Sequence, residues 1–161
     1  MDTRTFKSRL AIAEVAVQKV QGYLLWNGIP VYHVSQESWL PKWVHNRIKM
    51  INGQGLELLR HFPDMATDRA LLQIKSAKDA EKYPSVTIEQ ASFDVSLTLS
   101  KLGIPVLLVW WTEHEMLAGW AGEVGVSTPA TDRLAASGSH SPFYLVKKTD
   151  LKTLTDFKEK L

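Results

Sequence analysis

Three side chains near the middle of the chain could act together: Asp64, Gln73 and Lys75. The residues between them have turn composition at 67–70 and strand composition at 71–75, so we predict two short strands joined by a turn. Closing the hairpin on this turn places Asp64 opposite Gln73, with Cβ atoms about 5 Å apart. Lys75 follows Gln73 at the two-residue period of a strand and projects from the same face. Carboxylate and amide oxygens suit a hard divalent cation, and an ammonium stabilises developing negative charge.

The elements that must position this patch follow from the spacing of apolar residues. The order predicted is helix, strand, strand–turn–strand, helix, strand. The first helix spans Thr3–Trp26 and is ended by Asn27-Gly28, and the first strand is Ile29–Val34. The second helix is capped by Thr87, with Gln90 at the capping-box position, and ends at Leu102. The apolar run Ile104–Trp111 is predicted to be a strand covered on both faces. Later strands are expected around Trp120 and Tyr144–Val146, with a terminal helix over Leu151–Leu161.

The motif and the element order together resemble the PD-(D/E)XK nuclease superfamily. The motif stands here as Pro63-Asp64, eight residues, then Gln73-Ile74-Lys75, and the resemblance covers Thr3 to Trp111. It implies an α/β fold with a restriction-endonuclease-like core, a mixed central sheet flanked by helices in αβββαβ order. The departure is Gln73, which stands where the family usually has Glu or Asp.

The resemblance also implies a role for each residue of the motif. Asp64 would be the principal ligand of Mg²⁺, with Mn²⁺ able to substitute, and the Gln73 amide oxygen and the Ile74 carbonyl could coordinate too. Lys75 would position or help deprotonate the attacking water. Glu14 in the first helix corresponds to a metal-assisting glutamate found in many of these nucleases, although a solvated glutamate on a helix flank would look the same.

Two acidic residues could replace the missing strand carboxylate. Glu89 follows Lys75 after thirteen residues, in the first turn of the predicted second helix, where a subset of restriction enzymes with this fold carries its glutamate. The helix dipole favours a glutamate there regardless of function, so this assignment stays open. Asp68 is the other candidate, but the predicted register leaves it at the turn tip, about 13 Å along the strands from Gln73.

An insertion at about 35–60 interrupts the expected order and interleaves tryptophans with basic residues. Lys42, Arg47 and Lys49 could follow a phosphate backbone while the tryptophans stack on bases, and Lys78 and Lys82 form a basic linker after the motif. The tryptophans could equally pack on the core or on a partner subunit.

The composition bounds the function further. The length of 161 residues predicts one domain over 1–161. Because the net charge is only +2, any basic surface that binds DNA must be local. It has no apolar run of membrane-spanning length, so no membrane partner is expected, and its lack of cysteine fits a reducing cytoplasm. Its five histidines show no metal-ligand spacing.

The resemblance implies a Mg²⁺-dependent DNA endonuclease, and we expect it to act as a homodimer, since two symmetric sites would cut both strands. Holliday-junction-resolvase-like, restriction-like and homing activities all remain open. The alternatives are a non-catalytic nucleic-acid-binding module that keeps the fold, and an unrelated α/β domain.

The insertion yields a prediction that requires only DNA-binding measurements. Charge reversal at Lys42, Arg47 or Lys49 should weaken DNA binding and flatten its dependence on salt, because each phosphate contact releases counterions. Titration of labelled DNA at several salt concentrations measures both quantities. Unchanged binding with an altered sedimentation coefficient would instead identify a subunit interface.

Overall fold

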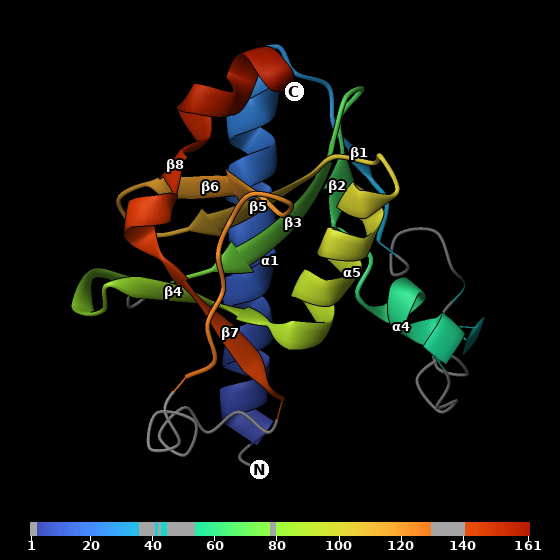
Figure 1. Cartoon of the computed structure of the whole chain (residues 1–161), viewed down its shortest axis with the longest axis vertical. Helices are drawn as coiled ribbons and strands as arrows, with labels where there is room; N and C mark the ends of the chain where they lie inside the picture. The colour runs from blue at the N-terminus through green and yellow to red at the C-terminus, as the bar shows by residue number, and fades with distance from the viewer. Residues whose placement is uncertain (1–2, 36–40, 42, 45–53, 78–79, 130–140) are drawn as a thin grey trace.

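Within the described part of the chain, a mixed sheet of six strands forms the centre of the fold (Figure 1). The computed structural model describes residues 3–35, 41, 43–44, 54–77, 80–129 and 141–161. The strands are β1 (Tyr32–His33), β2 (Met65–Ala66), β3 (Leu71–Ser76), β5 (Val106–Trp111), β6 (Met116–Trp120) and β8 (Lys152–Thr153). They lie in the order β1-β2-β3-β5-β6-β8; β3 and β5 run parallel and the other neighbours antiparallel.

The predicted hairpin register is confirmed. Met65 pairs with Leu72 and Ala66 with Leu71, so the turn closes on 67–70. The first strand pairs with β2 beyond the insertion, as expected, with Tyr32 opposite Ala66. It is shorter than predicted, since β1 contains two residues and Ile29 and Val31 instead pack against the core.

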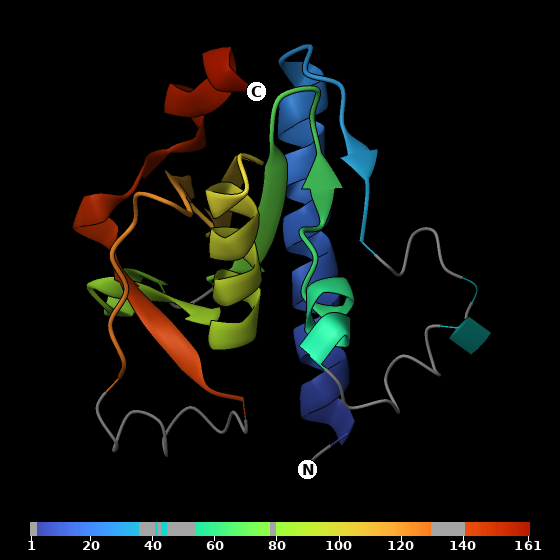
Figure 2. The same cartoon turned by 45° about the vertical axis from the view of Figure 1, so that its right-hand side comes forward.

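Helices cover both faces of the sheet, with α1 (Thr3–Trp26) on one side and α5 (Gln90–Lys101) on the other (Figure 2). Alternate residues of the central strands divide between these two layers. The layer under α1 contains Leu72, Ile74, Leu107 and Val109 with Ala16, Val20 and Leu24 of the helix. The layer under α5 contains Val106, Leu108 and Trp110 with Phe93, Val95 and Leu99. All but the last residue of β5 are buried, so the prediction of a strand covered on both faces is confirmed.

The first helix has the predicted bounds, and the turn that follows it contains Gly28, whose φ of 73° few other residues adopt. Its apolar stripe, which includes Leu10, Ala13, Val17, Val20 and Leu24, does not pack evenly on the core. Val20 and Leu24 are fully buried, whereas Leu10 is 52% exposed. The N-terminal half of α1 therefore extends beyond the core and leaves part of the stripe open to solvent.

The prediction that Thr87 caps the second helix is wrong. Residues Ser85–Glu89 form strand β4, which pairs antiparallel with β7 (Phe143–Lys147), and α5 begins only at Gln90. The β-branched residues at 86–88 suit a strand, and their partner lies more than fifty residues away in the sequence, where local patterns give no indication of it. The described residues therefore form a second, two-stranded sheet, whose first strand lies between β3 and α5 in the sequence.

Shorter elements complete the fold. The insertion contributes α4 (Gln54–Arg60), and 3₁₀ turns occur at η1 (Ala80–Lys82), η2 (Lys148–Asp150) and η3 (Leu154–Lys160). The predicted terminal helix is thus a 3₁₀ helix that starts after the edge strand β8. Phe157 in η3 packs edge-on against Trp120 with ring centroids 5.7 Å apart. No helix among the described residues is both long and apolar enough to span a membrane.

Trp110 connects the two sheets, and its removal tests this packing. Its side chain is fully buried, and the indole N–H donates a 2.8 Å hydrogen bond to the Thr87 carbonyl in β4. Trp110→Phe should lower the free energy of unfolding by about 2–4 kcal/mol, because it leaves a cavity in the core and removes the hydrogen bond to the Thr87 carbonyl. Urea unfolding followed by circular dichroism measures this.

Trp26→Phe is the matched control, because Trp26 is 91% exposed and should change stability by less than about 0.5 kcal/mol. Equal stabilities for the two variants would contradict the anchoring of β4 by Trp110.

Candidate active site

Asp64 stands directly before β2 and is held against β3 by hydrogen bonds from two successive residues. Its Oδ2 accepts a 2.7 Å bond from the backbone N–H of Ile74 and a 3.2 Å bond from Nε2 of Gln73. Its own backbone N–H donates to the Leu72 carbonyl. The predicted juxtaposition of Asp64 and Gln73 is therefore present in the structure.

The alternation along β3 places Gln73 and Lys75 on the α5 face. Met65, Leu72 and Ile74 point the other way, into the layer under α1, as the sequence predicted. Lys75 Nζ donates a 3.3 Å hydrogen bond to Ser92 Oγ on α5. The amide and the ammonium thus share one face of the strand.

The Ile74 carbonyl is directed toward the Asp64 side of β3. In a strand, successive peptide groups alternate between the two neighbouring strands. The N–H groups of Leu71 and Ala77 bond to β5 and its flanking residue, whereas the Ile74 N–H bonds to Asp64. Because residue 74 has the opposite parity to 71 and 77, its carbonyl also faces away from β5, toward the end of the short strand β2. This is the position required for the predicted carbonyl ligand.

A cleft of about 890 Å³ opens at this end of the sheet and gathers the predicted acidic and basic residues. It is lined by Glu14 from α1, by Asp64, Ile74 and Lys75 from the hairpin, and by Glu89 from the end of β4. Leu10 and Ala13, the exposed part of the α1 stripe, line it too. A smaller hollow of about 220 Å³ shares Asp64, Lys75 and Glu89 with the cleft and adds Gln73, Ser92 and His61.

The donor set of the hairpin fits a divalent cation. The Gln73 side chain is buried, and its Oε1 atom has no hydrogen-bond partner within the described residues. A buried acceptor without a partner is costly unless an ion or a water satisfies it. The Asp64 carboxylate, the Gln73 amide oxygen and the Ile74 carbonyl are oxygen ligands of the kind that Mg²⁺ binds, and Mg²⁺ usually keeps several waters besides.

The structure confirms the predicted position of Glu14 but not that of Glu89. Glu14 lies on α1 as predicted, is exposed, and lines the cleft. Glu89 does not lie in the first turn of α5: it ends β4 and precedes the helix, and its side chain makes no capping hydrogen bond. No three His, Cys, Asp or Glu side chains of the described residues come close enough together to hold a metal ion. Among the described residues, Asp64 is the carboxylate that contacts Gln73, and Glu14 and Glu89 line the same cleft.

The other predicted residues lie apart from this cleft. Asp68 is exposed in the turn, as the register required. Lys82 lies exposed in η1 and lines neither the cleft nor the hollow. Lys42, Arg47, Lys49 and Lys78 lie outside the described residues.

Sequence reasoning missed Ser92 and gave His61 no role. His61 follows α4, lines the smaller hollow and contacts Ser92, Glu57 and Glu89. A serine on the buried face of an amphipathic helix is the one local signal that could have drawn attention to Ser92, since buried hydroxyls require partners.

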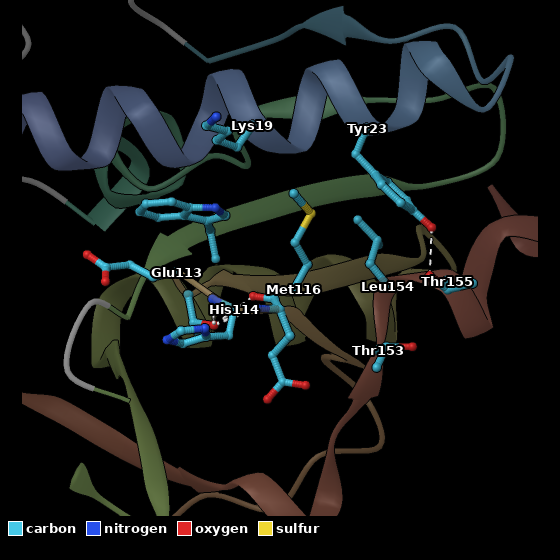
Figure 3. A pocket seen from close by; sticks show the side chains of 11 residues that line it. Lys19, Tyr23, Glu113, His114, Met116, Thr153, Leu154 and Thr155 are labelled. Carbon is cyan, nitrogen blue, oxygen red and sulfur yellow. Dashed lines mark hydrogen bonds between the residues drawn. The ribbon is translucent and has the colours of Figure 1, made fainter. Parts of the chain in front are cut away.

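A second cavity, of about 500 Å³, lies between α1, the β5–β6 turn and the start of η3 (Figure 3). Lys19 and Tyr23 line it from α1, and Glu113 and His114 from the turn. The Tyr23 hydroxyl bonds to Thr155 Oγ1 at 2.8 Å and ties η3 to α1. None of the predicted site residues lines this cavity, so we assign the site to the cleft around Asp64.

Comparison with known proteins supports the fold. No protein-family model and no curated protein matches the chain. Among solved structures it is similar to Hjc, a Holliday junction resolvase from the archaeal hyperthermophile Archaeoglobus fulgidus, at 8% sequence identity and a TM-score of 0.52, with 92% of this chain and 97% of the resolvase covered. It is also similar to D212, a nuclease from a fusselovirus, at 12% identity and a TM-score of 0.46, with 95% of this chain and 89% of D212 covered. The likeness to the resolvase shows the fold: a mixed α/β architecture with a mixed central sheet and flanking helices, as predicted.

Gln73→Glu tests whether a cation belongs beside Asp64. The new carboxylate would replace the amide that now donates to Asp64, so two carboxylates would face one another. Without divalent metal the variant should lose about 2–4 kcal/mol in the free energy of unfolding, and Mg²⁺ should restore most of the loss. Thermal unfolding with Mg²⁺, and with NaCl at equal ionic strength as the control, measures this. Equal recovery in NaCl would contradict a cation site.

Proposed function

We propose that this chain is a Mg²⁺-dependent endonuclease that hydrolyses phosphodiester bonds in DNA and prefers branched substrates. The observation that carries the proposal is that Asp64 and Lys75 line one cleft. Asp64 is fixed there by the Ile74 N–H, and Lys75 follows Ile74 on β3. The similarity in fold to a Holliday junction resolvase supports branched DNA as the substrate class.

The residues of the chain would divide the reaction between them. Asp64, Gln73 and Ile74 would hold the cation, with Glu14 and Glu89 as the nearby acidic groups of the cleft. When bound, the cation would polarise the scissile phosphate and lower the pKa of a coordinated water. Lys75 would orient the attacking water and stabilise the charge that develops on the phosphate oxygens.

A pair of such chains would cut two strands. We expect a homodimer, because symmetric copies present two equivalent sites to a junction. We also expect it to act in the cytoplasm. The basic residues at Lys42, Arg47, Lys49, Lys78 and Lys82 would supply the phosphate contacts that a net charge of +2 does not provide by itself.

A second candidate is a non-catalytic DNA-binding module with the nuclease fold. The observation that favours it is the amide at position 73, which leaves Asp64 as the hairpin carboxylate that lines the cleft. Cleavage separates the two functions, since both predict DNA binding.

Lys75→Ala and Asp64→Ala test the proposal. Each should lower the rate of Mg²⁺-dependent cleavage by about 100-fold or more, because Lys75 acts on transition-state charge and Asp64 on the cation. The measurement is single-turnover cleavage of supercoiled, linear, single-stranded and four-way-junction DNA with Mg²⁺ or Mn²⁺. DNA affinity should stay within a few-fold of the wild-type value.

Asp68→Ala is the matched control, an aspartate of the same hairpin that is exposed at the turn and should leave cleavage unchanged. If the wild-type protein binds junctions but cuts none of the substrates, the binding module is the better assignment. Undiminished turnover by purified Lys75→Ala would remove the roles drawn here.

A further inference from the structure

Ser92 is a polar residue on an otherwise apolar surface. It lies in the first turn of α5, faces the sheet and is 2% exposed. Its hydroxyl contacts two side chains from distant parts of the chain, Lys75 Nζ and His61 Nδ1, each at 3.3 Å. A core position on α5 would ordinarily hold an apolar residue, so these polar contacts need a reason of their own.

The chemistry of the ammonium fixes the direction of one of these two hydrogen bonds. An ammonium only donates, so Ser92 Oγ accepts from Lys75. The direction of the contact with His61 Nδ1 depends on the imidazole tautomer. With the imidazole proton on Nε2, which lies 3.3 Å from Glu57 Oε2 on α4, the Ser92 hydroxyl donates to Nδ1, and the bonds run in one sense from Lys75 to Glu57. Nδ1 also lies 3.9 Å from Glu89 Oε2.

Ser92 also explains why Lys75 does not pair with an acid. Lys75 shares the cleft with Asp64 and Glu89, and an ammonium on a flexible stem would ordinarily turn toward a nearby carboxylate. Among the described residues, Ser92 is nevertheless the hydrogen-bond partner of Lys75, and neither Asp64 nor Glu89 forms an ion pair with it. The hydrogen bond to the Ser92 hydroxyl thus holds the Lys75 ammonium at α5.

We infer that Ser92 and His61 are positioning residues: Ser92 holds the Lys75 ammonium in place, and His61 orients the Ser92 hydroxyl. This inference rests on the proposed nuclease function and assigns roles to two residues outside the motif. Because His61 follows α4 directly, the same bonds connect the insertion to the lysine of the site.

The test compares cleavage with DNA affinity in substituted proteins. Ser92→Ala should lower the single-turnover cleavage rate of junction DNA by about 10- to 100-fold, with DNA affinity unchanged, because the lysine loses its position and not its charge. Ser92→Thr keeps the hydroxyl and should recover most of the rate. His61→Ala should cause a smaller loss, and His61→Asn, which keeps an acceptor near Nδ1, should restore it.

A double-variant cycle separates positioning from a general effect on folding. In a Lys75→Ala background, Ser92→Ala should cost no further rate, because its effect passes through the lysine. The matched control is Ser96→Ala, one turn further along the same face of α5: Ser96 is also buried, but its hydroxyl bonds to the Ser92 carbonyl and not to Lys75. It should match Ser92→Ala in thermal stability and the wild type in cleavage.

The outcomes distinguish the two proposals. If the wild-type protein cuts DNA and Ser92→Ala is as fast as Ser96→Ala, the positioning roles are refuted and the nuclease assignment stands. A Ser92→Ala loss that persists in full in the Lys75→Ala background also refutes them. A wild-type protein that cuts no DNA refutes the nuclease function itself, and the positioning roles with it.

Discussion

The short hydrogen bond from the Ile74 N–H to the Asp64 carboxylate is the contact on which the site depends. Strand β2 contains only two residues, so it ends before it can pair with the rest of β3. Asp64 takes the place of the next backbone partner and satisfies a peptide group with its side chain. Acceptance of a backbone N–H by a carboxylate is a strong, charge-assisted interaction, and it fixes the acid relative to the strand. The functional group is thereby positioned by the ladder of the sheet and not by a flexible loop.

This contact also determines which groups of β3 lie near Asp64, because successive residues of a strand alternate in direction. With Asp64 bonded at residue 74, residue 73 presents its side chain and residue 74 its carbonyl near the same carboxylate. The strand itself is held rigidly, because β5 beside it is buried on both faces. The Asp64 carboxylate is therefore held between the Gln73 side chain and the Ile74 backbone N–H. Compared with a carboxylate, the amide of Gln73 lowers the negative charge beside Asp64. In the absence of a cation, Gln73 and Asp64 form a hydrogen bond, where two carboxylates would repel one another.

The crossover between β3 and β5 supplies the other wall of the site. After η1 it forms β4, which is anchored through Trp110 and paired with β7, and then α5. The junction of these two elements brings Glu89 to the mouth of the cleft and turns Ser92 toward β3. On the far side, α1 extends past the core and contributes Glu14. The acidic groups of the cleft thus come from three elements that are far apart in the sequence, and the packing of two core layers sets their separation.

The sequence by itself determined the hairpin register, the bounds of α1, the buried central strand, the contact of Asp64 with Gln73, and the position of Lys75 on the same face of β3 as Gln73. These are local: a turn, a period of two and an apolar run fix them within a few residues. Only the tertiary structure decided that residues 85–89 form a strand, because their partner at 143–147 is remote and a β-branched segment beside a good cap suits either state. The same long-range pairing moved Glu89 out of α5. The contact of Ser92 with Lys75 and His61 could not be read from the sequence either, since it joins a helix, a strand and the end of the insertion. Such a contact is set by how the layers pack, and no pattern of neighbouring residues records it.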